Sequence, residues 1–317
     1  MKSFAEREAY RAMTQTAAVS KTQIKAQPAQ SSNPDNTVPT RRMDFEESMR
    51  GLPKHFARDG DLIGSHVTMA LSSVFPEGED YFVRSVRNYR DKVTDPALKR
   101  QVAGFIGQES VHGREHRVFN ERLAELGYPA KEYEAVTRVG LKIREKLLPA
   151  KSNLAATAAL EHFTATLAEL VLTSEEIRDL MGEDAVRDLF VWHALEESEH
   201  KAVAFDVYKA VGGGERLRVW TMNFFRFGFV FGIGLAVVLS LLRDRATYKR
   251  GVLRKSWKRW KSSPVMDPAL WRQLKDYNRP DFHPNDRDTT ELVETWRAKL
   301  FGEDGTLNDK LASGKAA

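Results

Sequence analysis

The chain has 317 residues, enough for one large domain or two small ones, and its 42% hydrophobic content supports a real core. It has no cysteine, which excludes disulfides, thiolate zinc sites and cysteine nucleophiles; a metal would need His, Asp and Glu ligands, which favour iron, manganese or zinc. The net charge of +5 is uneven: residues 243–261 hold nine Lys/Arg against one Asp, hence +8, which leaves −3 for the rest of the chain.

The N-terminal part is predicted to be a disordered tail, which we place at residues 1–45. It is rich in polar residues and proline, shows little periodicity, and lacks the apolar core of a signal peptide. Helical patterning starts at Asp61. The segment 61–93 is expected to form one long helix, or two helices broken near Pro76, because a proline removes an interior hydrogen bond.

The next helix has clear start and stop signals. Asp95 is a good N-cap and Pro96 suits the first helical position, so a helix is predicted from there to about Leu126. The Gly-Tyr-Pro sequence at 127–129 should end this helix. A connecting helix is then predicted over 131–147, where the residues again show a helical pattern.

Two further helices complete the central part of the chain. Ser152 should cap an alanine-rich helix over 153–172, and another helix is predicted from near Gly182 to Val211. The three glycines at 212–214 should end that helix. We find no run of alternating apolar residues typical of a strand, so the predicted fold class is all-α.

Residues 219–242 form an apolar segment that differs from the rest. Sixteen uncharged residues follow Arg226, fewer than the roughly 20 that span a bilayer. The basic segment 243–261 comes directly afterwards and contains Trp257 and Trp260, an arrangement typical of a membrane anchor. The alternative interpretation is a buried fifth helix packed on the bundle.

These features divide the chain into four parts. The predicted parts are a disordered tail over 1–45, a metal-binding helical bundle over 46–214, an apolar helix with a basic, membrane-proximal segment over 215–262, and a polar tail with short helices, one of them near 289–301, over 263–317.

Two Glu-x-x-His motifs, Glu109–His112 and Glu197–His200, are the most informative feature of the sequence. The i, i+3 spacing places both side chains of a motif on one helix face, and His193 lies one turn before Glu197 on the same face. Two lone glutamates lie in the helical segments that precede the motifs, Glu79 and Glu161. One glutamate from each of two helices and a Glu-x-x-His from each of two others form the dinuclear metal site of a ferritin-like four-helix bundle. We therefore predict that fold, with additional helices and a C-terminal apolar helix.

Other polar residues near these motifs receive less direct roles. Glu77 is the alternative to Glu79, because a proline and a glycine lie beside it. His116 lies one turn beyond His112 and could bind metal, orient a ligand or donate a proton; we assign it as the catalytic residue. Residues expected at the surface or behind the ligands are His162, Glu196 and Glu199. The alternative to a metal site is that the glutamates pair at a helix surface with Arg114, Arg117 or Lys201.

Four stretches of the sequence carry a family resemblance. They are ALSSVFPEGEDYFVRSVRNYRD, FIGQESVHGREHRVFN, TAALEHFTA and WHALEESEHKAVAFDVY. Together they resemble the bacterial family described as predicted metal-dependent hydrolases. The histidine-rich pattern also resembles the di-iron N-oxygenases that act on aryl amines, in which an additional histidine joins the usual ligands. That resemblance implies the metal ligands Glu79, Glu109, His112, Glu161, His193, Glu197 and His200. The apolar segment 219–242 and the basic segment 243–261 depart from the N-oxygenase pattern, since those soluble enzymes would not need them.

The leading functional hypothesis is a di-iron oxidase or oxygenase. Two iron ions, or manganese or zinc in their place, would be bridged by glutamates and would activate O₂ with electrons from a separate donor. The apolar segment suggests a lipid or another apolar substrate drawn from a membrane. The second hypothesis is a metal-dependent hydrolase that uses a metal-activated water, with His112 and His116 as an i, i+4 pair on one zinc. Iron storage or a purely structural bundle is ranked last.

The expected partners and location follow from the uneven charge. The basic segment should contact an anionic membrane surface at the cytoplasmic face of the inner membrane, with the cytoplasm as the alternative location. Residues 249–261 could neutralise phosphates, but their position beside an apolar run favours lipid, so nucleic acid is not an expected partner. A homodimer is compatible with the sequence.

Overall fold

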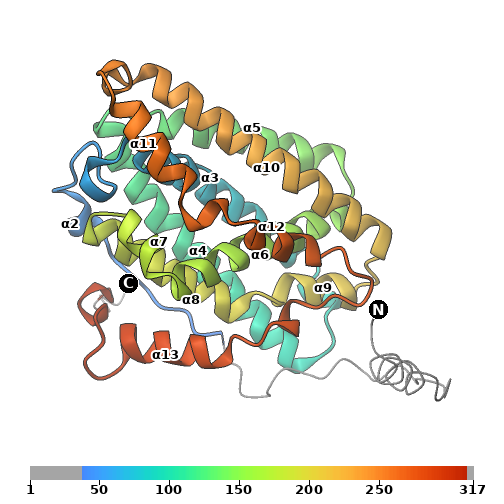
Figure 1. The fold of residues 1–317 in the computed structure, drawn as a ribbon. Helices are drawn as coiled ribbons and strands as arrows, with labels where there is room; N and C mark the ends of the chain where they lie inside the picture. Colours follow the sequence, from blue (N-terminus) through green and yellow to red (C-terminus); the bar gives the residue numbers. More distant parts are fainter. Residues whose placement is uncertain (1–37, 313–317) are drawn as a thin grey trace, which may run out of the picture. The chain divides into compact units, whose positions relative to one another are not determined.

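The computed structural model describes residues 38–312, and most of these residues are helical (Figure 1). The predicted all-α class is confirmed: within residues 38–312 the only β-pairing is an isolated antiparallel bridge between Met43 and Leu311. The α-helices in chain order are α2 (Glu46–Met49), α3 (Leu62–Arg87), α4 (Pro96–Glu125), α5 (Ala130–Leu147), α6 (Ala150–Thr173), α7 (Glu175–Leu180), α8 (Asp184–His200), α9 (Val203–Ala210), α10 (Glu215–Arg243), α11 (Val252–Lys261), α12 (Pro268–Asp276) and α13 (Thr290–Phe301).

Four of these helices form a bundle. α3 packs along α4, α6 packs along α8, and further contacts join α3 to α6 and α4 to α8. The buried apolar residues of the described part form two separate clusters. One includes Met69 of α3 and Phe119 of α4, and the other includes Val86 of α3 and Phe105 of α4. On α3 and α4, the stretch between the two clusters is therefore left for polar residues.

α3 runs without a break through Pro76, so the one-helix alternative is the one observed. A proline has no N–H, which leaves the carbonyl of Ser72, four residues earlier, without its helical partner. Asn120 of α4 supplies a partner by donating from Nδ2 to Ser72 O at 3.1 Å. The helix continues because a neighbouring helix replaces the missing hydrogen bond.

Two helix starts show where local signals succeed and where they fail. α4 begins at the predicted position, and the Asp95 side chain accepts a hydrogen bond from Ala97 N. The predicted Ser152 cap is wrong, because α6 already begins at Ala150 and its preceding residue makes no side-chain cap. Ser152 lies in the first turn and instead accepts hydrogen bonds from Arg144 of α5 through its carbonyl and hydroxyl oxygens.

The single helix predicted between Gly182 and Val211 is wrong, because the chain forms two helices there. α8 ends at His200 and α9 begins at Val203. At the turn, Lys201 Nζ donates to the carbonyl of Arg287 at 2.6 Å and to the hydroxyl of Thr289 at 2.9 Å. Contacts with such a distant segment leave no trace in the local sequence pattern.

The predicted disordered tail is only partly within the described residues. Residues 1–37 lie outside them, whereas residues 38–45, which we call the N-terminal strap, lie against the bundle. Pro39 O accepts a hydrogen bond from Gln108 Nε2 of α4 at 2.9 Å. The buried hydrophobic residues of the strap are Val38, Met43 and Phe45.

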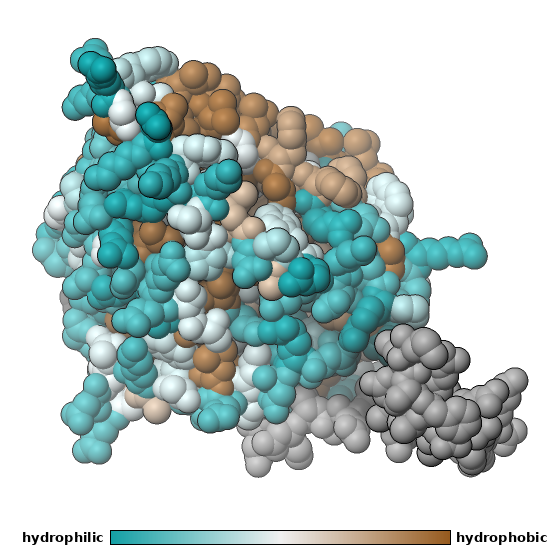
Figure 2. All heavy atoms as spheres, viewed as in Figure 1, coloured by the Kyte–Doolittle hydropathy of each residue, from teal (hydrophilic) through white to brown (hydrophobic). Residues whose placement is uncertain are grey.

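The apolar segment forms α10, a 29-residue helix that packs along α3 and α6 (Figure 1). By length and composition it could cross a membrane, and only 11% of its most apolar 18-residue window is buried. Its outer side belongs to the band of hydrophobic surface in Figure 2. α10 is thus packed on the bundle by one face and exposed by the other. Later helices also cover the bundle, with α11 on α3, α12 on α6 and α13 on α8.

Candidate metal centre

Four helices bring the predicted metal ligands together between the two apolar clusters. α3 supplies Glu79, α4 supplies Glu109 and His112, and α6 supplies Glu161. α8 supplies three residues from one face, spaced i, i+4 and i+7: His193, Glu197 and His200. All seven are at most 4% exposed. The centre is therefore enclosed within the bundle.

One group of potential ligand atoms surrounds His200. Its Nε2 lies 3.0 Å from Glu109 Oε1, 3.4 Å from Glu161 Oε2 and 3.6 Å from Glu197 Oε2. The His200–Glu109 distance is that of an ion pair, but the two atoms do not have hydrogen-bond geometry. These atoms converge on one point from three helices, as ligands of a single ion would.

A second group surrounds His112 and His193. His112 Nδ1 lies 3.8 Å from Glu109 Oε1 and 3.7 Å from Glu197 Oε1. His193 Nε2 lies 2.9 Å from Glu197 Oε1 and 3.7 Å from Glu79 Oε1. Glu109 and Glu197 belong to both groups, and the two oxygens of Glu197 face different groups. Shared carboxylates of this kind are the feature that lets a helical bundle hold two adjacent cations.

Many buried ligand atoms have no hydrogen-bond partner among the described residues. They are both carboxylate oxygens of Glu79, Glu109 and Glu161, Oε2 of Glu197, Nδ1 of His112 and Nε2 of His200. An unsatisfied polar atom in a protein interior is costly, so a cluster of them indicates a missing ligand. Carboxylate oxygens and imidazole nitrogens suit iron, manganese or zinc. The residues present therefore fit a pair of divalent cations.

The electrostatics of the carboxylates agree with this fit. Burial, and then the charge of Glu161, raise the pKa of Glu109 to about 8. Burial and Glu197 raise the pKa of Glu161 to about 7, and burial and Glu109 raise that of Glu79 well above its usual value. Burial also opposes ionisation of Glu197, but His200 and His193 together outweigh burial and lower the pKa of Glu197. Without a cation, the centre keeps protons that a metal would displace.

The ring nitrogens that face away from the centre have fixed partners. His112 Nε2 donates to Glu196 Oε2 at 3.0 Å, which leaves Nδ1 for the centre. Gln108 donates from its amide nitrogen to Glu199 Oε2 at 2.7 Å, so its amide oxygen is the acceptor for His200 Nδ1 at 2.8 Å. His200 Nε2 is thereby left for the centre.

Glu196 and Glu199, expected at the surface or behind the ligands, are buried and paired with arginines. Arg41 of the strap lies 2.8 Å from a carboxylate oxygen of each. Arg297 of α13 lies 2.8 Å from Glu199. The strap and α13 are therefore linked to the centre through these two glutamates. Glu196 contacts the ligand His112, and Glu199 contacts Gln108, which holds the ligand His200.

His116 is held in one orientation by a chain of hydrogen bonds that begins at Ser72. Because Asn120 Nδ2 donates to the Ser72 carbonyl, its Oδ1 accepts from the Ser72 hydroxyl at 2.8 Å. The Ser72 oxygen then accepts from His116 Nδ1 at 2.9 Å. Burial and His193 lower the pKa of His116, so the ring is neutral and its Nε2 accepts from His193 Nδ1 at 2.7 Å. Of the three roles considered for His116, this arrangement supports orienting a ligand.

Two of the other candidates lie outside the centre. Glu77 Oε1 accepts a hydrogen bond from Arg138 at 2.9 Å, so it is Glu79 that faces the centre. His162 Nε2 lies 3.1 Å from Gln273 O of α12. The basic residues considered as surface partners pair elsewhere: Arg114 with Glu115, Arg117 with Asp80, and Lys201 with the carbonyl of Arg287.

The sequence matches one family model, described as "Predicted metal-dependent hydrolase", over residues 39–288. The matched region contains all seven candidate ligands of the metal centre. The chain belongs to this family. Neither a curated protein nor a solved structure matches it. The family description indicates a metal-dependent enzyme, and it names hydrolysis rather than oxidation as the reaction.

In this member of the family, three polar residues that hold the histidines were not predicted from the sequence: Gln108, Asn120 and Ser72. Gln108 directly precedes Glu109, and Asn120 lies four residues after His116, so adjacency and helical spacing gave some signal. Ser72 gave none, because its role depends on a partner in another helix.

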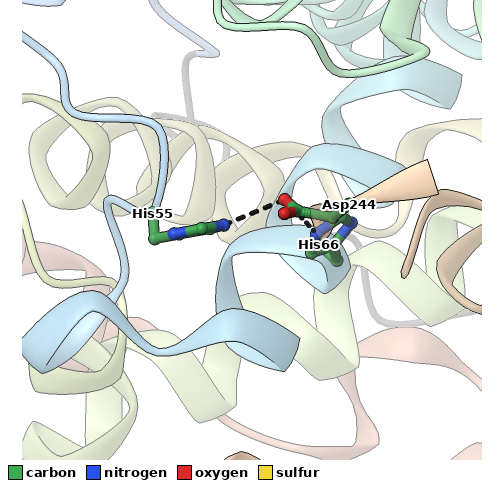
Figure 3. A group of neighbouring side chains, drawn as sticks. All are labelled: His55, His66 and Asp244. Atoms are coloured by element: carbon green, nitrogen blue, oxygen red, sulfur yellow. Dashed lines mark hydrogen bonds and ion pairs between the residues drawn. The ribbon is translucent and has the colours of Figure 1, made fainter. Parts of the chain in front are cut away.

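A second group of potential ligands also escaped prediction: His55, His66 and Asp244 (Figure 3). Asp244 Oδ2 lies 2.9 Å from His55 Nε2 and 3.3 Å from both His66 Nε2 and Lys54 Nζ. His66 Nδ1 lies 2.7 Å from Ser240 Oγ. Because a lysine already supplies positive charge and the polar atoms have partners, the group is best described as a clamp. It fastens the C-terminal end of α10 to α3.

Proposed function

We propose that the centre binds two divalent metal ions and that the reaction of this enzyme takes place there. The observation that carries the proposal is the pair of overlapping ligand groups that share Glu109 and Glu197. One tetrahedral ion uses four donors, so seven donors exceed the need of a single site. The mixture of carboxylates and histidines favours iron or manganese, with zinc as the alternative.

Hydrolysis is the reaction that family membership supports. A divalent ion bound here would supply a water molecule of lowered pKa as the nucleophile. The surrounding residues would take up, return or hold the protons of the reaction. Neither oxygen of Glu79 has a hydrogen-bond partner among the described residues, and burial raises its pKa, which suits a group that takes up and returns a proton. His193 keeps its proton on Nδ1, because that N–H donates a hydrogen bond to His116 Nε2.

Oxidation with O₂ is a second candidate, and the distribution of donors over the helices favours it. A lone glutamate from each of α3 and α6, with a Glu-x-x-His from each of α4 and α8, is the pattern of di-iron and di-manganese carboxylate proteins. Two ferrous ions would supply electrons to O₂. This candidate also requires an electron donor and an oxidisable substrate, for which a lipid or another apolar molecule is our proposal.

Metal content tests the centre, and the chain offers a matched pair of variants. Metal-free protein is loaded under anaerobic conditions with Fe(II), Mn(II) or Zn(II), and bound metal is measured. We predict two ions for the unmodified chain and for Glu77→Gln, but loss of at least one ion in Glu79→Gln, because only Glu79 faces the centre. Saturation at one ion, or equal loss in both variants, would contradict a two-metal site.

The reaction is tested on the same loaded proteins. Cleavage of esters, amides or phosphodiesters in the absence of O₂ would support hydrolysis. Consumption of O₂ by the iron-loaded form in the presence of a chemical reductant, with a change in its absorption spectrum, would support oxidation. Glu79→Gln should lose the activity that the unmodified chain shows.

A further inference from the structure

α5 and α10 lie side by side and run in opposite directions. Near one end of the pair, Tyr133 Oη donates to the carbonyl of Ala236 at 2.8 Å. Near the other end, the Arg144 guanidinium lies 5.1 Å from the centre of the Phe225 ring. Figure 1 shows the two helices together along one edge of the bundle. They form a two-helix layer with one side on the bundle and the other toward solvent.

The outer side of this layer is apolar, and we call it the apolar face. On α5, its exposed residues follow helical spacing: Val136, Val139, Ile143 and Leu147. On α10 they include Trp220, Phe224, Phe227, Phe231, Leu235 and Val238. Phe227 and Phe231 are 70% and 72% exposed. The band is visible along α10 in Figure 2. An apolar patch of this extent marks an interaction surface.

α11 follows α10 after a short turn and adds positive charge. One side of α11 is docked on the start of α3: Ser256 Oγ donates to Asp61 Oδ1 at 2.8 Å, and Arg259 Nη1 lies 3.2 Å from Asp61 Oδ2. The exposed basic residues of α11 are Arg254, Lys255, Lys258 and Lys261. Trp257 among them is 54% exposed. Basic residues with an exposed indole are suited to the headgroup region of a membrane.

Buried polar contacts hold both ends of α10 on the bundle. Near its N-terminal end, the fully buried Arg218 donates to the carbonyls of Tyr277 and Arg279. Near its C-terminal end, Ser240 contacts His66. Asp244, directly after the helix, also contacts His66 (Figure 3). A bilayer-spanning α10 would have to leave the bundle and break these contacts, which would leave the buried carbonyl of Tyr277 and the carbonyl of Arg279 without their Arg218 donor. The geometry therefore favours α10 remaining in place.

We propose that the protein binds the surface of an anionic lipid bilayer with α10 lying in the membrane plane. The apolar face of α5 and α10 would enter the interface, while α11 would contact acidic headgroups. Charge selects this occupant over a second copy of the chain. A bilayer with acidic lipids complements the positive charge of α11, whereas an identical copy would repeat it. The sequence suggested a membrane anchor, and this arrangement makes it one that lies in the membrane plane.

Vesicle flotation of the purified full chain tests the proposal. The protein, prepared without detergent, is mixed with phosphatidylcholine vesicles with or without phosphatidylglycerol. We expect binding that is strongest with phosphatidylglycerol. Phe227→Ser/Phe231→Ser should bind about 100-fold more weakly to both kinds of vesicle, because inserted aromatic area is lost. Lys255→Gln/Lys258→Gln should bind about 30-fold more weakly to phosphatidylglycerol vesicles alone.

Matched controls lie outside the apolar face and α11. Met266→Ser removes an apolar side chain that is 43% exposed, and Lys99→Gln/Arg100→Gln removes two exposed charges at the start of α4. Neither control should change vesicle binding. All the variants keep the seven ligand residues, so metal content and helical content report whether each one has folded. Loss of vesicle binding with metal content intact separates this proposal from that of the metal centre.

Three results would overturn the proposal. Folded protein that does not float with either kind of vesicle, or floats equally in all variants, removes the lipid surface as the partner. Protein that requires detergent and resists alkaline extraction from vesicles indicates a spanning α10. A dimer that is disrupted by Phe227→Ser/Phe231→Ser, without vesicle binding, assigns the apolar face to a second copy.

Discussion

At the scale of single residues, each ligand histidine is held through the ring nitrogen that faces away from the centre. The acceptors are Glu196 for His112, Gln108 for His200 and His116 for His193. Such partners fix the tautomer and the ring orientation, and losing one lowers metal affinity by about 10- to 100-fold in known metal sites. The proton positions in this centre therefore depend on residues that do not face the metal.

Ser72 and Ser73 offer a matched test of this dependence. Ser72 lies between Asn120 and His116, whereas the equally buried Ser73 donates to the Met69 carbonyl of its own helix. We predict that Ser72→Ala raises the Kd for metal about tenfold, because His116 loses the acceptor that fixes its tautomer. Ser73→Ala should change it little. Metal titration of the metal-free proteins measures both values, and equal values would show that Ser72 does not control His116.

The raised pKa values predict a pH dependence for the metal-free protein. Folded Glu109 and Glu161 have pKa values of about 8 and about 7, whereas an unfolded glutamate has one of about 4.3. The folded state therefore binds more protons near neutral pH, so stability falls as pH rises through the folded pKa values. We expect the free energy of unfolding, from denaturant titration after metal removal, to drop by about 1 to 2 kcal/mol from about pH 7 to about pH 8.

Bound metal should abolish this drop, because cations take the place of the protons. Glu109→Gln should reduce the drop in the metal-free protein, because the substituted side chain does not titrate. If the metal-free protein instead gains stability over the same range, these carboxylates are already ionised without metal, and the argument from their burial is wrong.

At the scale of helices, the sequence predicted what depends on local geometry. The spacing within α4 and α8 predicted which side chains share a face, because that follows from the helical repeat alone. The structure brings those side chains together with Glu79 and Glu161. The helix start at Asp95 and the helix end at residues 212–214 were predicted well, whereas the cap predicted at Ser152 was wrong.

Features that depend on distant partners could not be predicted from local patterns. α3 continues through Pro76 because Asn120, on another helix, donates a hydrogen bond to the Ser72 carbonyl that the proline leaves without a partner. The strap resembles a disordered tail in composition, yet its backbone and Arg41 bind the bundle. Which of Glu77 and Glu79 faces the centre depends on how α3 is turned against its neighbours: the two side chains project from opposite sides of α3, and Glu77 meets Arg138 of α5. In each case the deciding contact joins residues far apart in sequence.

At the scale of the whole described chain, its two ends meet beside α8. The Met43–Leu311 bridge joins the strap to the C-terminal segment. Arg41 from the strap and Arg297 from α13 both contact Glu199. The metal centre is therefore supported from outside the four-helix bundle, through charges that reach it from both ends of the described residues.

Arg41 and its neighbour Arg42 provide the test at this scale. The Arg41 side chain is 10% exposed and pairs with the fully buried Glu196, which accepts a hydrogen bond from His112. The Arg42 side chain, in contrast, is exposed. Glu199 retains Arg297 when Arg41 is removed, but Glu196 loses the arginine that contacts it. Breaking a buried ion pair costs about 3 kcal/mol or more.

We predict that Arg41→Ala lowers the free energy of unfolding by about 3 kcal/mol and also weakens metal binding. Arg42→Ala should do neither, because within residues 38–312 only its backbone carbonyl is engaged, by Ala312 N at 2.8 Å. Denaturant titration and metal titration of both variants measure the two effects separately. Equal losses of stability would indicate that the strap acts through general packing. A loss of stability with unchanged metal affinity would show that Glu196 orients His112 without help from Arg41, and that the strap supports the fold but not the centre.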